Sequence, residues 1–168
     1  MTPDQRSFNY FINLIHEFDE SINAKNDLLI FVLRFHLLAE NMLERIIKGA
    51  LPRGANLINK SRLSFAQKLA VVDALGIIDE NLVVSLDRLN SLRNKCAHKR
   101  KMKVTLKEID PISEPFGEKL STVKPDPDQD PEQPELNAAV LATAFFHSHI
   151  YDQLVKILLP LEAREDSP

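Results

Sequence analysis

The segment from Asn26 to Leu51 constrains the fold of this chain more than any other. Its apolar residues recur every three to four positions, which is the period of an amphipathic α-helix. No proline interrupts the pattern before Pro52, and Pro52 with Gly54 is expected to end the helix. A helix with so broad an apolar face should be the central element of a helical core. That face contains Phe31, Phe35, Leu38, Ala39, Met42, Ile46 and Ala50.

Four further segments have the helical period, and capping residues open three of them. They span residues 1–18, 64–76, 79–97 and 136–161. The chain has only 4 glycines, which disfavours a turn-rich β-fold. The sequence therefore predicts an all-α fold, an up-and-down bundle of about five helices that forms a single domain over residues 1–168.

The segment between the last two predicted helices differs in composition. Six prolines fall between Pro111 and Pro134, and many of the other residues are acidic. Prolines remove backbone donors, and a segment with few apolar residues buries too little surface to offset the entropy of ordering. We therefore expect residues 108–135 to form a Pro-rich acidic loop or arm, anchored by Phe116.

Composition argues against several classes of site. The single Cys96 excludes an intramolecular disulfide and a multi-cysteine metal site. His147 and His149 are spaced i,i+2, so they point to different faces of a helix. A core-edge His147 and an exposed His149 are therefore expected, and neither a metal nor a cofactor is predicted. His36 and Glu40 are interpreted as an ion pair or a supporting contact.

The expected location and partners of the protein follow from its apolar runs, its N-terminal pattern and its net charge. The longest apolar run, residues 28–33, is far shorter than the ~20 residues of a membrane-spanning helix. The N-terminus lacks the pattern of a signal peptide. A cytoplasmic protein with no membrane partner is the expectation. A formal net charge of −3 argues against general binding of polyanions by the whole molecule.

Arg93 interrupts the apolar stripe of the fourth predicted helix. It falls on the face that Leu86 and Leu89 define. A guanidinium on a core-facing stripe costs on the order of several kcal/mol unless it is paired or hydrated. Arg93 should therefore face a carboxylate, a polar cleft or a subunit interface, and Glu40 is one candidate partner.

His98 follows five residues later. On a continuous helix this spacing places its side chain ~140° from that of Arg93. The two share a face only if the helix ends or distorts near Ala97. Alternatively, they meet across a symmetric dimer in which each chain presents the same surface.

The residues around this pair are basic. Between Arg88 and Lys103 there is no Asp or Glu. Such a segment suits a helix C-terminus and, beside a histidine, the binding of phosphate. A solvated helix terminus remains an equally weighted interpretation. The positive charges of the segment come from Arg88, Arg93, Lys95, Lys99, Arg100, Lys101 and Lys103.

The motif Arg93-Asn94-Lys95-Cys96-Ala97-His98 resembles the Arg-x4–6-His signature of the HEPN superfamily, in its Arg-Asn-x-x-Ala-His form. The resemblance covers residues 26–105. To a lesser extent, the Phe116-Gly117-Glu118 loop and the last helix are similar to the mannitol operon repressor branch. HEPN proteins are small helical bundles, and many are metal-independent ribonucleases.

The resemblance implies a site and a mechanism. His98 would act as general base on a ribose 2′-OH or as general acid on the leaving oxygen. Arg93 would bind the scissile phosphate, and Asn94 would orient the histidine or bind the phosphate. Two chains would form one cleft as a homodimer, and the 2′-OH requirement would make the substrate RNA. The RNA-binding residues would be Lys95, Lys99, Arg100, Lys101 and Lys103.

The biological role implied is the toxin of a toxin–antitoxin pair or a phage-defence effector, with an antitoxin or regulatory protein as partner. The alternative is a non-catalytic dimeric adaptor or regulator that uses the cleft for a nucleotide or a protein. Direct transcriptional repression is a third possibility, although no helix-turn-helix signal is visible. Within the motif, Cys96 is interpreted as a small buried filler rather than a reactive thiol.

Overall fold

The computed structural model describes residues 27–98, 102–123 and 134–165, and all regular secondary structure in these ranges is helical. This confirms the all-helical prediction. The helix expected over residues 1–18 lies outside the described residues. No helix in the described ranges is long and apolar enough to cross a membrane.

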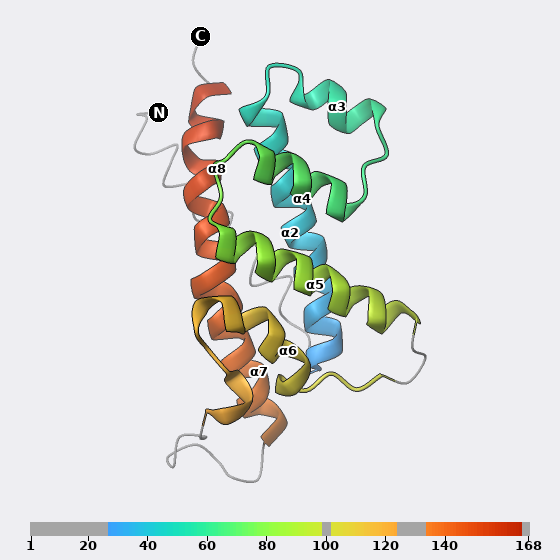
Figure 1. Ribbon diagram of the computed structural model, residues 1–168, viewed down its shortest axis with the longest axis vertical. Helices are drawn as coiled ribbons and strands as arrows, with labels where there is room; N and C mark the ends of the chain where they lie inside the picture. The colour runs from blue at the N-terminus through green and yellow to red at the C-terminus, as the bar shows by residue number, and fades with distance from the viewer. Residues whose placement is uncertain (1–26, 99–101, 124–133, 166–168) are drawn as a thin grey trace.

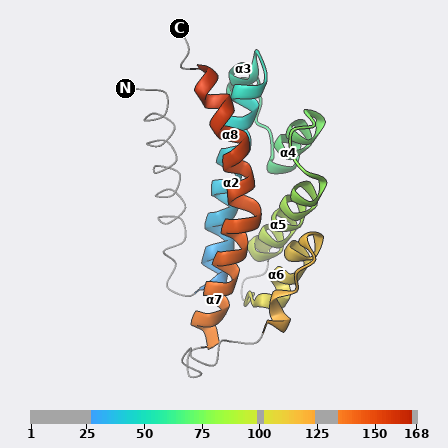
Figure 2. The ribbon, with the colours of Figure 1, turned by 90° about the vertical axis from the view of Figure 1, so that its left-hand side faces the viewer.

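One layer of the fold consists of the two longest helical stretches (Figure 1). They are α2 (Leu28–Ala50) and a C-terminal stretch in which α7 (Pro134–Phe145), the π-helical segment η3 (Phe146–Tyr151) and α8 (Asp152–Glu165) follow one another without a break. They lie side by side and run in the same direction (Figure 2), so the arrangement is not a simple alternation of up and down.

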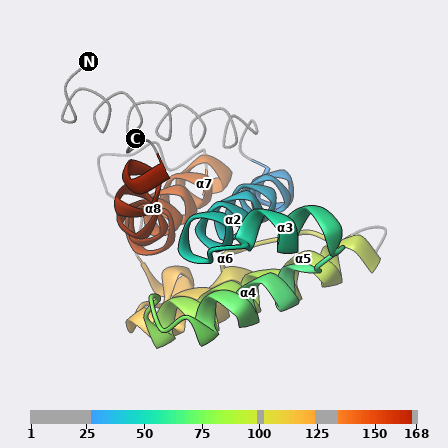
Figure 3. The same cartoon turned by 90° about the horizontal axis from the view of Figure 1, so that it is seen from above.

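The second layer crosses the first. It contains α4 (Phe65–Ala74), α5 (Glu80–His98) and α6 (Leu106–Ser113). Seen from above, α4 and α5 cover one side of α2 (Figure 3), and both contact it directly. The predicted signature helix therefore lies across the middle of the central helix.

Local capping explains where the helices begin. The side chain of Asp27 accepts a hydrogen bond from the amide of Leu29 at 2.9 Å and caps α2. Ser64 and Gln67 form the expected capping box at the start of α4. Asp79 accepts from the amide of Asn81 at 2.8 Å and opens α5. These polar groups satisfy amides that have no partner within the helix.

The core lies between the two layers and is built from apolar side chains of every long helix. Three aromatic rings join α2 to the C-terminal stretch. The centroid of Phe146 lies 4.6 Å from that of Phe35 and 5.2 Å from that of Phe31, both in edge-on geometry that aromatic pairs favour. The largest fully buried side chains are Tyr151, Phe35, Phe146, Met42, Leu43, Ile46, Ile47, Leu82, Leu86, Leu89 and Ile109.

A short helix, α3 (Gly54–Lys60), was not predicted from the sequence. Pro52 and Gly54 were expected only to end the preceding helix, but α2 ends at Ala50 and Gly54 begins α3. A Cβ atom on Gly54 would lie 2.0 Å from the carbonyl oxygen of Ile47, so only glycine permits this close approach.

The prediction of a loop over residues 108–135 is wrong for its first half. Residues 106–123 contain α6 and the 3₁₀ turns η1 (Glu114–Phe116) and η2 (Leu120–Thr122). Ile109 and Ile112 are buried in the core, and this burial offsets the helix-disfavouring Pro111, which lies inside α6. Residues 124–133 lie outside the described part of the chain.

Candidate functional site

Arg93 lies on an uninterrupted α5, one turn after the buried Leu89. Its side chain is half-buried, and one guanidinium nitrogen donates to Oδ1 of Asn94 at 3.2 Å. Among the residues that the structure describes, no carboxylate forms an ion pair with Arg93. A partly desolvated cation without a carboxylate is an arrangement that attracts an external anion.

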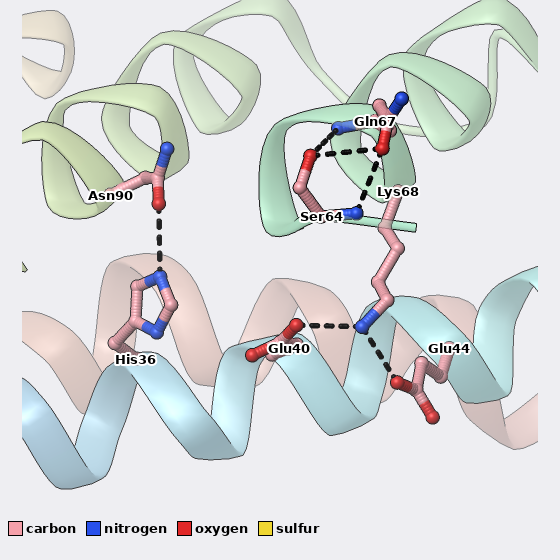
Figure 4. Close-up of polar contacts among 7 residues, drawn as sticks. All are labelled: His36, Glu40, Glu44, Ser64, Gln67, Lys68 and Asn90. Carbon is pink, nitrogen blue, oxygen red and sulfur yellow. Dashed lines mark hydrogen bonds and ion pairs between the residues drawn. The ribbon is translucent and has the colours of Figure 1, made fainter. Parts of the chain in front are cut away.

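Glu40 does not fill the expected role as the partner of Arg93. Its Oε1 atom instead accepts from Nζ of Lys68 on α4 at 2.6 Å, and Oε1 of Glu44 lies 2.7 Å from the same nitrogen (Figure 4). Burial opposes the charged form of Lys68, but the hydrogen bonds to the two carboxylates outweigh it and raise the pKa of the lysine. The sequence did not indicate the pairing of Glu40 with Lys68, because it does not show that α4 packs beside α2.

His98 is the last residue of α5, and its side chain is exposed. Because the helix continues through Asn94 and Cys96 to His98, the angular separation of ~140° from Arg93 applies. The structure therefore does not bring Arg93 and His98 together within one chain. The other arrangement expected from the sequence, contact across a symmetric dimer, stays a prediction.

The remaining residues predicted for the site lie around the end of α5. Asn94 and Lys95 are exposed, and Lys103 is exposed in the segment that follows. Lys99, Arg100 and Lys101 lie outside the described residues. No Asp or Glu occurs between Arg88 and Lys103 in the sequence, so the charged side chains of this segment are all basic.

His36 is buried beneath α5. Only 3% of its surface is exposed, and its ring stacks on Phe65 with centroids 4.3 Å apart. Its Nε2 atom lies 3.1 Å from Oδ1 of Asn90, which is one turn before Arg93 (Figure 4). Burial is the main cause that lowers the pKa of His36, and the positive charge of Arg93 contributes.

Asn90 is the contact that sequence reasoning missed. Its only signal in the sequence is that a polar amide precedes Arg93 by three residues, on a neighbouring position of the same helix. Together His36, Asn90 and Arg93 form a polar cluster at the contact of α2 with α5.

Cys96 lies next to this cluster in the chain, and its thiol is half-buried. Burial raises its pKa, and the negative charge of Glu108 adds to the effect. A raised pKa keeps the sulfur protonated and unreactive at neutral pH. The structure therefore supports the interpretation of Cys96 as a packing residue.

His149, in the π-helical segment η3, docks the loop that contains Glu118. His149 was expected to be exposed, but its side chain is only 31% exposed, against 42% for His147. It stacks on Phe145, and Nε2 lies 3.2 Å from Oε1 of Glu118. The π-helical segment changes the rotation per residue and so the face that each histidine occupies. Phe116 packs against Phe145, with ring centroids 5.9 Å apart, which confirms its anchoring role. In the described ranges, no group of three or more potential ligands could hold a metal.

Comparison with protein-family models, curated proteins and solved structures gives no match for this chain. The proposed function therefore rests on Arg93, Asn94 and His98 and on the basic segment around them.

Proposed function

We propose that this protein is a metal-independent endoribonuclease of the HEPN type that cleaves RNA with Arg93 and His98. The observation that supports the proposal is the half-buried Arg93, which has no carboxylate partner among the described residues and lies in an acid-free basic segment. A cation held in this way is available to a phosphate group.

In the proposed reaction, the guanidinium of Arg93 binds a non-bridging phosphate oxygen and stabilises the negative charge that develops in the transition state. The His98 imidazole removes the proton from a ribose 2′-OH, or donates one to the departing 5′ oxygen. Histidines exchange protons near neutral pH and suit either step. Asn94, which hydrogen-bonds Arg93, holds the guanidinium in place.

A second copy of the chain completes this site, because Arg93 and His98 project from different sides of α5. An apolar stripe on α2 supports such an assembly. Leu37 is 61% exposed and Ile30 is 41% exposed, and Leu33 lies between them on the same side of the helix.

The decisive experiment incubates purified protein with RNA in excess chelator. Cleavage that persists, leaves 2′,3′-cyclic phosphate ends and disappears in both Arg93→Ala and His98→Ala supports the proposal. Lys60→Ala, an exposed position on α3, is the matched control for loss of a positive charge. Cleavage that is unaffected by either site substitution refutes the assignment.

Mixing the two inactive variants tests the shared cleft. A heterodimer of Arg93→Ala and His98→Ala subunits has one intact composite site, so random mixing should restore roughly a quarter of the wild-type activity. A site contained in one chain gives no recovery. Leu37→Asp should yield a monomer without cleavage activity, as sedimentation and the same RNA assay would measure.

The separation of Arg93 from His98 favours a second candidate, a dimeric adaptor or regulator that binds a nucleotide or phosphorylated partner without cleaving it. Overexpression separates the two candidates. Growth arrest that His98→Ala relieves favours a toxin nuclease with a cognate antitoxin. Normal growth, no RNA cleavage and Arg93-dependent binding of a nucleotide favour the adaptor.

A further inference from the structure

The polar cluster beneath α5 contains a buried histidine with an unused nitrogen. Oδ1 of Asn90 is an acceptor, so Nε2 of His36 carries the proton that joins them. The other nitrogen, Nδ1, is buried and has no hydrogen-bond partner in the described structure. Buried polar atoms are nearly always paired, and an exception calls for an explanation. Nδ1 is therefore the atom of His36 that takes up a proton.

Three charged groups influence His36, and Arg93 among them follows Asn90, the hydrogen-bond partner of His36, by one turn of α5. Arg93 comes from α5, Lys68 from α4 and Glu40 from its own helix. The charge of Glu40 raises the pKa of His36, and the two cations lower it, after burial itself as the largest cause. Glu40 is held by Lys68, whereas Arg93 has no carboxylate partner among the described residues. Arg93 is thus the charge near His36 that an external ligand can neutralise.

We propose that His36 couples anion binding at Arg93 to proton uptake in the core, so that the site binds a phosphate group more tightly as the pH falls. The inference rests on the proposed function only in taking Arg93 as the anion-binding residue. A bound anion offsets the repulsion between the guanidinium and a protonated imidazole. By thermodynamic linkage, protonation of His36 strengthens anion binding to the same extent.

Sulfate is a suitable probe, because it remains a dianion from pH 5 to pH 8 whereas phosphate titrates in this range. Sulfate binding to the full chain is measured by calorimetry from pH 8 to pH 5.5, in two buffers with different ionisation enthalpies. Proton uptake appears as a dependence of the heat on the buffer. Because protonation of His36 and sulfate binding are linked, the affinity for sulfate should rise several-fold as the pH falls, in step with the number of protons taken up.

Variants identify the responsible group. His36→Gln retains a donor toward Asn90 but has no titrating nitrogen, so it should bind sulfate with neither proton uptake nor the gain at low pH. His147→Ala, which removes a partly exposed histidine of η3 outside the proposed site, should keep both. The ring resonances of wild-type His36, followed by NMR with and without sulfate, give the same answer without a substitution.

The outcomes separate this inference from the proposed function. Absence of sulfate binding, or binding unchanged in Arg93→Gln, refutes the anion site and with it both proposals. Binding that requires Arg93 but shows the same pH dependence in wild type and His36→Gln refutes the coupling alone. Proton uptake that persists in His36→Gln but disappears in His98→Ala also refutes it, because the exposed histidine would then be the proton acceptor.

Discussion

Replacement of Lys68 by methionine tests the ion cluster that joins α4 to α2. Lys68 is 8% exposed and contacts Glu40 at 2.6 Å and Glu44 at 2.7 Å. Methionine retains the apolar stem of the lysine but removes the ammonium group. Two carboxylates, one turn apart on α2, then remain partly buried without a cation.

The expected loss in the free energy of unfolding lies between the value for a buried ion pair and the value for a surface ion pair. Removal of one partner from a buried ion pair costs about 3–5 kcal/mol, whereas a surface pair contributes about 0–1 kcal/mol. Glu40 and Glu44 are about one quarter exposed, at 26% and 28%, so water screens them in part. Like charges at i,i+4 add about 0.2–0.5 kcal/mol. We therefore expect Lys68→Met to lower the free energy of unfolding by about 2–3 kcal/mol.

Urea denaturation followed by far-ultraviolet circular dichroism measures the change, and the slope of the transition should stay constant. For a chain of this size the same loss lowers Tm by about 5–10 °C. Lys60→Met, on exposed α3, should change stability by less than about 0.5 kcal/mol. The triple variant with Glu40→Gln and Glu44→Gln should recover much of the loss, because no unpaired charge remains.

The pH dependence of this contribution follows from the raised pKa of Lys68. The stabilisation is fully present below the ordinary value of 10.5 and is lost as the pH rises through the higher folded value. Wild type and Lys68→Met should thus converge in stability only in strongly alkaline solution. A loss below about 1 kcal/mol at neutral pH, or one equal to that of Lys60→Met, would show that solvent already screens the cluster.

Three other sites give simpler predictions. Gly54→Ala should lower the free energy of unfolding by more than about 2 kcal/mol, because its Cβ meets the Ile47 carbonyl. Gly76→Ala should cost only about 1–2 kcal/mol, because Gly76 has a φ of 65° but no atom within 4 Å of the added Cβ. Thermal denaturation measures both changes. Cys96 should react with iodoacetamide more slowly at pH 8 than a free cysteine, because burial raises its pKa; equal rates would contradict that burial. The lowered pKa of His36 means that the unfolded chain binds its proton more readily, so stability should fall as the pH drops below 6.5, and less steeply in His36→Gln; equal slopes would exclude this contribution.

Much of the helical framework was predictable, because its signals are local. The apolar period, the Ser64 capping box and the Asp79 cap each lie within a few residues of the structure they specify. Arg93 was conspicuous for the same reason, since a cation in an apolar stripe is visible from spacing alone. The helical rotation between Arg93 and His98 is likewise a property of the sequence once α5 is known to be continuous.

Other features depended on contacts between segments distant in the sequence. Proline-based rules predicted no helix at α6, yet burial of Ile109 and Ile112 against the core stabilises one there. The π-helical segment at residues 146–151 depends on packing around it, and it decides that His149 faces Glu118.

The partners of the charged groups show the difference between what the sequence determines and what the tertiary structure determines. The sequence by itself determined that the chain is helical, where α2, α4 and α5 lie, and that Arg93 needs an unusual environment, because propensity, capping and periodicity act over single turns. Only the tertiary structure decided that Glu40 pairs with Lys68 rather than with Arg93, and that the buried His36 hydrogen-bonds Asn90. These pairings join residues that are 28 and 54 positions apart in the sequence, so they depend on how whole helices pack against one another.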